Sequence, residues 1–157
     1  MERYKWSRLS PLQLGRYAEY LVKMEFTLHG FDVYTAEVDD KGIDFVIRKE
    51  HKQVGEEPKY SYYDVQVKSI RGMYYIFLPK ERFTLRDNLL AAIGLFEDGD
   101  LPRLYLIPAT AWHQPNALFV DRDYEGLKSK PEYGLNISER NLLLLERYKF
   151  ENQVEHL

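Results

Sequence analysis

The chain has 157 residues with no cysteine, a formal net charge of -3 and a pI near 5.8, so it offers neither a disulfide framework nor a thiolate metal site. A chain of this length can bury about 70% of the surface that its unfolded form exposes, and we expect one domain, residues 1–157, in a reducing, cytoplasmic setting. The acidic balance argues against nucleic-acid binding by bulk charge, and the longest apolar run, Leu89–Phe96, is too short to cross a membrane.

The predicted elements begin with a helix. Ser10 supplies an N-cap hydroxyl, Pro11 suits the first helical position, and Gln13 completes a capping box. The helix is expected to run from Pro11 to about His29, where Gly30 ends it. Alternating apolar residues then predict strands at Phe31–Ala36, Ile43–Arg48 and Ser61–Ile70, joined by a turn at residues 39–42 and a polar loop at residues 49–59.

The middle of the chain is predicted to add further strands. Met73–Leu78 has the pattern of a fourth strand that ends at Pro79. The unbroken apolar run Leu89–Phe96 is compatible with a buried strand or with a core helix. We favour a strand, because residues 97–102 suit a hairpin turn and Arg103–Ile107 suits the partner strand.

The last third of the chain is predicted to be less regular. Pro108–Trp112 suits a short helical turn, and Ala117–Asn136, rich in Gly, Pro and charge, suits a surface excursion. Ser138 is expected to cap a final helix whose core face is Asn141–Tyr148. The element order predicts an α/β or α+β fold, with a central mixed sheet flanked by an N-terminal and a C-terminal helix.

Two of the predicted strands carry polar side chains within apolar patterns. Gln66 and Lys68 share one face of a strand, about 7 Å apart, and Asp44 lies in the strand before it. If the two strands pair as an antiparallel hairpin, Asp44 can stand beside both. The Asp44 carboxylate, the Gln66 amide oxygen and the Val67 carbonyl oxygen suit a hard cation such as Mg²⁺. Lys68 would then orient or deprotonate a water, or neutralise charge on a phosphate.

Each of these polar residues also has a structural interpretation. Asp44 and Lys68 could form a cross-strand ion pair, with Gln66 as a bystander. Glu19 lies at the apolar edge of the predicted first helix, which makes it a further candidate for the site. The alternative for Glu19 is a surface carboxylate paired with Lys23 one turn later.

A local excess of basic residues follows the third predicted strand. Between Val65 and Arg86 there is a single acid, Glu81. The segment could be a solvated face or a rim that faces phosphate groups, and the pattern does not separate the two. Its basic residues are Lys68, Arg71, Lys80, Arg82 and Arg86.

Three short motifs occur in order along the chain: GRYAE at Gly15–Glu19, GIDFVI at Gly42–Ile47 and DVQVKS at Asp64–Ser69. Between the first two, HGFDV at His29–Val33 leads into the first predicted strand. In order and spacing, over about residues 10–110, they resemble the PD-(D/E)XK nuclease superfamily. The chain is most similar there to small prokaryotic restriction-endonuclease-like domains of unknown function, and its QxK motif is similar to that of Mrr-type enzymes. The resemblance implies a restriction-endonuclease-like core of a helix, three strands, a helix and a strand. It also implies phosphodiester hydrolysis that depends on Mg²⁺ or Mn²⁺.

The resemblance assigns roles residue by residue. Glu19 matches the helix acid that assists metal binding, Asp44 the metal-binding acid, Gln66 the second ligand position, and Lys68 the lysine near the attacking water. The chain departs from the family because Gln66 replaces the commoner acid, which removes one negative charge. It also lacks a clear second core helix, because the segment Lys80–Asn88 is short and the next run is predicted as a strand.

These observations favour one function and leave alternatives open. The leading hypothesis is a metal-dependent nuclease acting on DNA. The alternative is a catalytically degraded module that binds nucleic acid or protein, as the glutamine at position 66 suggests. A third hypothesis is a subunit that acts with a partner protein, and a domain this small makes a homodimer or such a partner plausible.

Overall fold

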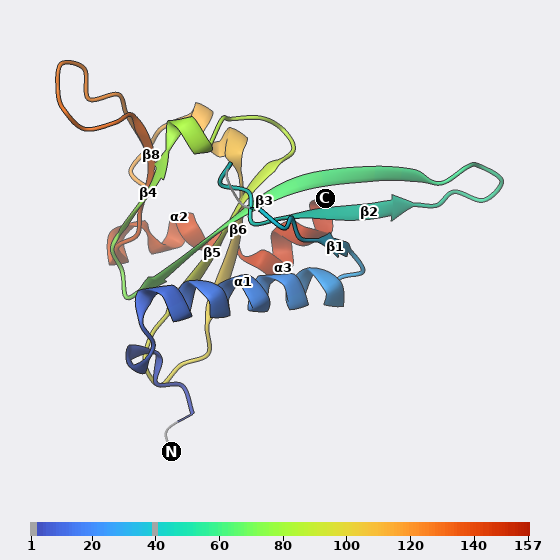
Figure 1. Cartoon of the computed structure of the whole chain (residues 1–157), viewed down its shortest axis with the longest axis horizontal. Coiled ribbons are helices and arrows are strands. Elements are labelled where there is room, and N and C mark those ends of the chain that lie inside the picture. The colour runs from blue at the N-terminus through green and yellow to red at the C-terminus, as the bar shows by residue number, and fades with distance from the viewer. Residues whose placement is uncertain (1–2, 39–40) are drawn as a thin grey trace.

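The computed structural model describes residues 3–38 and 41–157, and a five-stranded sheet in the order β1-β2-β3-β5-β6 lies at its centre. A smaller sheet, β4-β8-β7, packs above one face, and the β2–β3 hairpin and the β7–β8 connection project from the body as two arms (Figure 1). The helices are α1 (Pro11–Leu28), α2 (Leu142–Glu146) and α3 (Phe150–Gln153), and the strands are β1 (Asp32–Tyr34), β2 (Phe45–His51), β3 (Lys59–Arg71), β4 (Tyr75–Pro79), β5 (Leu89–Phe96), β6 (Arg103–Pro108), β7 (Phe119–Arg122) and β8 (Glu132–Asn136).

The large sheet is mixed, as the sequence predicts. Strands β3 and β5 run parallel, whereas the other neighbours in the sheet are antiparallel. Parallel strands need a long crossover, and residues 72–88 supply it with β4 and the short 3-10 turn Lys80–Arg82 in place of a core helix. The apolar run Leu89–Phe96 is fully buried and forms the strand that we predicted, with Arg103–Pro108 as its hairpin partner.

The first helix forms as its sequence predicts and covers one face of the sheet. The Ser10 side chain and the Gln13 side chain complete a reciprocal capping box, and the helix ends before Gly30, whose φ is +81°. Val22 and Phe26 of α1 are completely buried in a cluster that includes Val65 of β3. Because successive strand residues point to opposite faces, this packing fixes which side of β3 each polar residue occupies.

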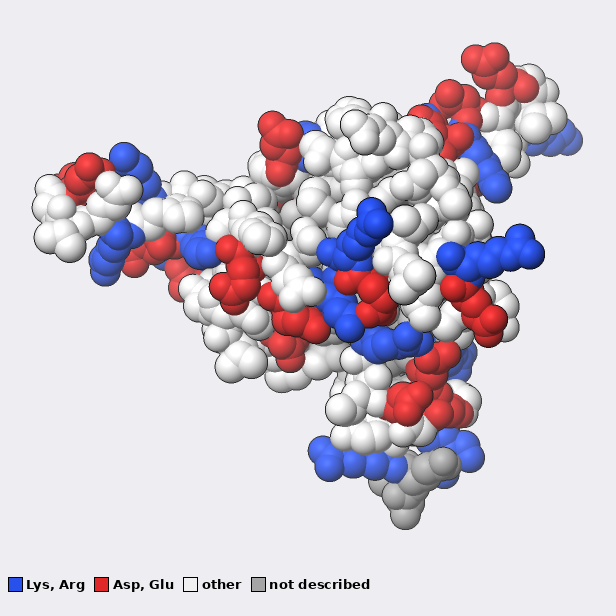
Figure 2. All heavy atoms as spheres, turned by 180° about the vertical axis from the view of Figure 1, so that it is seen from behind, with Lys and Arg blue, Asp and Glu red and all other residues white. Residues whose placement is uncertain are grey.

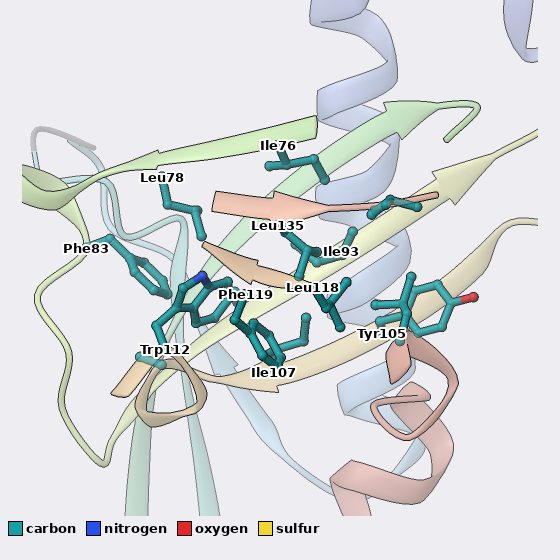
Figure 3. Close-up of a cluster of buried hydrophobic side chains, with 14 of the residues drawn as sticks. Ile76, Leu78, Phe83, Ile93, Tyr105, Ile107, Trp112, Leu118, Phe119 and Leu135 are labelled. Carbon is teal, nitrogen blue, oxygen red and sulfur yellow. The ribbon is translucent and has the colours of Figure 1, made fainter. Parts of the chain in front are cut away.

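The opposite face of the sheet packs against the small sheet and α2, whereas α3 packs with α1 on the first face. Figure 3 shows this cluster, in which Ile93 and Ile107 of the large sheet meet Leu135 of the small one. Trp112 is buried in this cluster beside Phe83, and its indole N–H donates a 2.8 Å hydrogen bond to the Gly134 carbonyl oxygen. The crossover between β3 and β5 is therefore anchored by its own hydrophobic core.

The surface excursion predicted at Ala117–Asn136 is only partly correct. Its two ends form β7 and β8, which pair with each other and, through β8, with β4. Phe119 and Leu135 are buried there. The free energy gained by burying these apolar side chains explains why strands form in a stretch whose overall composition is polar. Only residues 123–131 form the projecting loop.

The predicted last helix is wrong in both its start and its length. The Ser138 side chain makes no capping hydrogen bond, and a 3-10 turn at Glu139–Asn141 precedes the five-residue α2. The chain then leaves the helical path, because the Tyr148 carbonyl oxygen accepts a 2.8 Å hydrogen bond from the Leu106 N–H of β6. Pairing with the sheet edge thus replaces a continued helix.

The first three strands agree with the sequence in order, but their lengths differ. The first strand is shorter than Phe31–Ala36, while the hairpin of β2 and β3 extends beyond its predicted ends, so its loop covers only residues 52–58. The predicted turn at residues 39–42 includes positions 39 and 40, which lie outside the described residues.

Within the described part of the chain, no helix has the length and apolar character needed to span a membrane. Acidic and basic side chains alternate over the face seen in Figure 2.

Candidate functional site

The site begins where the pairing of β2 with β3 ends. The last paired residues are Phe45 and Val65, and before Phe45 the chain leaves the regular strand. Ile43 packs in the cluster on one side of the large sheet, whereas Phe45 packs with α1 on the other. Strand alternation would place both on the same face, so Asp44 lies at a local break in the strand. This corrects the predicted start of the strand at Ile43.

The Asp44 carboxylate takes the place of a missing strand carbonyl. The Asp44 N–H donates to the Val65 carbonyl oxygen at 2.9 Å, and one carboxylate oxygen of Asp44 accepts the Val67 N–H at 2.6 Å. Because the N–H and C=O of one strand residue point towards the same neighbour, the Val67 carbonyl also faces this side of β3. Asp44 and Val67 therefore meet at the edge of β3 that β2 has left.

Gln66 lies beside this edge and is almost completely buried. The residue is 5% exposed, and its Oε1 atom is buried without a hydrogen-bond donor among the described residues. An unsatisfied buried acceptor costs about 1–3 kcal/mol relative to one that is hydrogen-bonded. Such an atom marks either a local cost in stability or a place where a ligand binds.

Lys68 shares the face of β3 that carries Gln66. Both face away from α1, because Val65 and Val67 occupy the side that packs on the helix. Lys68 is half-buried, and in the sheet register it lies next to Ile93 of β5. The predicted pairing of Gln66 and Lys68 on one face is therefore present in the fold.

Glu19 approaches from the other side of the sheet. It is 8% exposed, and its two carboxylate oxygens accept hydrogen bonds of 2.7 Å from Arg16 and from Lys23. The i+4 pair with Lys23, which was the alternative interpretation, is thus present. Because α1 covers the face opposite Gln66, Glu19 could meet the other candidates only at the open edge of β3. In this structure its oxygens are held by cations of its own helix.

The arrangement fits a divalent cation in part. Among the described residues, no group of three or more His, Asp or Glu side chains could hold a metal ion. A mixed set of oxygens is present instead, because the unpaired Oε1 of Gln66, the Asp44 carboxylate and the Val67 carbonyl come from adjacent positions of two strands. Oxygen donors of this kind suit Mg²⁺, which retains several waters and needs few protein ligands.

Gly42 is a residue of this site that the sequence analysis did not single out. Its φ is +76°, and a Cβ added there would lie 3.1 Å from the Arg82 Cβ and 3.2 Å from the Gln66 Nε2. The glycine therefore allows the loop before β2 to lie directly on Gln66. The signal was present in the sequence, because Gly42 closes the predicted turn and opens the second motif.

Comparisons with known proteins give one structural likeness. No family model matches the chain, and no curated protein matches its sequence. The crystal structure of Hjc, a Holliday junction resolvase from the hyperthermophilic archaeon Archaeoglobus fulgidus, superposes with a TM-score of 0.50 at 12% sequence identity. The alignment covers 90% of this chain and 95% of that one. The likeness confirms the predicted mixed-sheet, restriction-endonuclease-like fold.

Proposed function

We propose that this chain is a divalent-metal-dependent nuclease that hydrolyses phosphodiester bonds of DNA. The proposal is carried by the buried, unpaired Oε1 of Gln66, the residue before Val67, whose N–H donates to the Asp44 carboxylate at the end of the β2–β3 ladder. A polar group left unpaired inside a core is unfavourable for stability alone, and a ligand for it would remove that cost. The restriction-endonuclease-like fold supports the same proposal, since nuclease sites occur on that fold.

Each residue of the site has a proposed task. Asp44, Gln66 and the Val67 carbonyl would hold Mg²⁺ or Mn²⁺, and the bound ion would supply a Lewis acid for a phosphate oxygen. The Val67 N–H keeps the Asp44 carboxylate oriented towards the open edge. The Lys68 ammonium would stabilise the negative charge that develops on the phosphate and orient the attacking water. The role of Glu19 as a ligand stays a prediction, and it requires one oxygen to leave Arg16 or Lys23.

Cleavage assays on three kinds of DNA test the proposal. Supercoiled plasmid, linear duplex and a synthetic four-way junction are incubated with the protein in Mg²⁺, in Mn²⁺ or in EDTA. The junction is included because of the likeness to a resolvase. We expect metal-dependent cleavage of at least one substrate. If all three remain intact in both metals, the nuclease proposal is wrong.

Two variants connect this cleavage to the site. Asp44→Asn keeps an oxygen acceptor for the Val67 N–H but removes the charge, and Lys68→Met removes the ammonium at similar length. We expect each to reduce the cleavage rate by about 100-fold or more. Arg140→Gln is the matched control, because Arg140 is exposed and lies outside the site. Equal cleavage by all four proteins would point to a contaminating nuclease.

One observation favours a second candidate function, a non-catalytic module that binds nucleic acid. Glu19 is already held by two cations, and position 66 carries no charge, so the site has less negative charge than the family motif implies. Calorimetric titration with Mn²⁺ separates the two functions. Binding that disappears in Asp44→Asn supports the nuclease, whereas no binding by the wild type supports the non-catalytic module. A homodimer or a partner protein also stays a prediction.

A further inference from the structure

A hollow of about 540 Å³ lies directly beside the candidate site. It forms where the loop that precedes β2 meets the segment between β4 and β5, two parts of the chain that run side by side (Figure 1). A Cβ added to Gly42 would lie 3.1 Å from the Arg82 Cβ and 3.2 Å from the Gln66 Nε2, so Gly42 forms a wall between the hollow and the site. The residues that line it are Lys41, Ile43, Asp64, Glu81, Arg82, Thr84 and Arg86.

Several of the basic residues in this segment are held by partners within the fold. Lys80 forms ion pairs with Asp121 and Asp123, both outside the hollow. The Arg71 guanidinium donates to backbone carbonyl oxygens near the N-terminus, including that of Leu9 at 3.0 Å. Lys80 and Arg71 are therefore already held by partners within the protein.

Arg82 differs from its neighbours. Within residues 3–38 and 41–157, the Arg82 side chain has neither an ion pair nor a hydrogen bond, and the same is true of the Lys41 side chain. The two acids of the hollow are already engaged, because Asp64 pairs with Arg86 and Glu81 pairs with Lys130. The hollow therefore contains two cations that no acid of the described residues neutralises.

We propose that this hollow is an anion-binding subsite for the phosphate next to the one that reacts. Arg82 and Lys41 would bind the phosphate oxygens, with the Thr84 hydroxyl as an additional donor. Arg86 pairs with Asp64, which leaves the charges of Arg82 and Lys41 uncancelled by that acid. The inference rests on the proposed function, because it places a nucleic-acid strand across the wall shared by the hollow and Gln66.

The subsite would explain how an acidic protein attracts a polyanionic strand to its site. The net charge of the chain is -3, so bulk electrostatics do not attract a polyanion. Two cations that no acid of residues 3–38 and 41–157 neutralises would give local attraction beside the site, and they would favour a polynucleotide over a single nucleotide. Phosphate contacts position a strand without reading its sequence, so we expect the subsite to show no base preference.

Binding measured without catalysis tests the subsite. A fluorescein-labelled 20-base-pair duplex and the corresponding single strand are titrated with protein in EDTA, and fluorescence anisotropy is followed over a range of NaCl concentrations. We expect Arg82→Gln to bind whichever form the wild type prefers about tenfold more weakly. We also expect its slope of log affinity against log salt to fall by about 1, because one phosphate contact is lost. Arg140→Gln, an equally exposed arginine elsewhere, should bind as the wild type does.

A second probe locates the phosphate. Oligonucleotides carry one uncharged methylphosphonate linkage, moved step by step along the strand. At one position we expect the wild type to lose affinity while Arg82→Gln loses none further. If the losses from the variant and from the linkage add at every position, or if Arg82→Gln and Arg140→Gln bind alike, the subsite is wrong.

The outcomes separate this inference from the nuclease proposal. Arg82-dependent binding in EDTA without cleavage in any metal would support the subsite and reject the nuclease. Metal-dependent cleavage together with binding that does not depend on Arg82 would support the nuclease and reject the subsite.

Discussion

Two buried polar side chains, Glu19 on α1 and Gln66 on β3, differ in how the protein satisfies them. Both belong to residues that are less than a tenth exposed. Glu19 has a cation on each of its oxygens, whereas the Oε1 of Gln66 has no donor among the described residues. The charged group is thus satisfied within its own helix, while the neutral group is not.

The cost of leaving each group without a partner indicates which of the two side chains is better suited to bind a ligand. A buried carboxylate without a partner would cost several kcal/mol, and Arg16 and Lys23 remove that cost without any ligand. A buried amide oxygen costs less, so a fold of ordinary stability can leave it unpaired until a ligand arrives. We therefore infer that Glu19 has a structural role in the ligand-free protein, and that Gln66 is the stronger candidate for contact with a ligand.

The largest expected effect is the loss of stability in Glu19→Gln. Removing the negative charge leaves Lys23, whose side chain is 17% exposed, without an anion, and we expect the free energy of unfolding to fall by about 2 kcal/mol. Urea unfolding at pH 7 measures it. Glu25→Gln on the same helix is the control, because the Glu25 carboxylate forms no ion pair with a described residue. If both variants are equally stable, the ion pairs of Glu19 do not support the fold and the comparison with Gln66 fails.

The next effect concerns cation binding by Gln66→Glu. A carboxylate at position 66 adds the charge that the family motif carries, and we expect Mn²⁺ to bind about tenfold more tightly in calorimetric titration. Without metal, the same variant should be less stable than the wild type, because it places a negative charge at a position that is only 5% exposed. Gln114→Glu, at an exposed position, should change neither property. Unchanged Mn²⁺ affinity would mean that position 66 does not contact the ion.

Local sequence was sufficient to predict the elements whose signals lie within a few residues. The capping box of Ser10 and Gln13 defined α1, and the apolar run Leu89–Phe96 with its turn defined the β5–β6 hairpin. The strand at Phe119–Arg122 was not predicted, and the last helix was predicted to be longer than Leu142–Glu146, because both segments depend on partners far along the chain. The pairing of β7 with β8, and the hydrogen bond from Leu106 of β6 to the Tyr148 carbonyl oxygen, outweigh the local preferences of these two segments.

The candidate site was predictable in its residues but not in its contacts. Period-two alternation placed Gln66 and Lys68 on one face. It could not reveal that Asp44 accepts the Val67 N–H, because that bond depends on the break in β2. It also could not reveal that Gln66 is left without a donor, because the crossover that covers it follows a path set by tertiary packing.

The smallest expected effect is the change in stability on replacing Gln66, which tests most directly whether this side chain, unlike Glu19, is unnecessary for the fold. Gln66→Leu replaces an unpaired acceptor by an apolar side chain of similar size, and we expect the free energy of unfolding to change by less than about 1 kcal/mol, or to rise. The matched control is Asn141→Leu. Asn141 is also a buried amide, but its Nδ2 donates to the carbonyl oxygens of Ala117 and Asn136, both at 2.9 Å.

Removing the Asn141 amide leaves two carbonyl oxygens without this donor, so we expect Asn141→Leu to lower the free energy of unfolding by about 1–3 kcal/mol in the same urea titration. A loss of that size in Gln66→Leu would mean that the amide supports the fold after all. Retained stability together with lost Mn²⁺ binding would mean that position 66 is kept polar for a ligand. Because both substitutions replace a buried amide by leucine, the difference between them isolates the hydrogen bonds that Asn141 makes and Gln66 lacks.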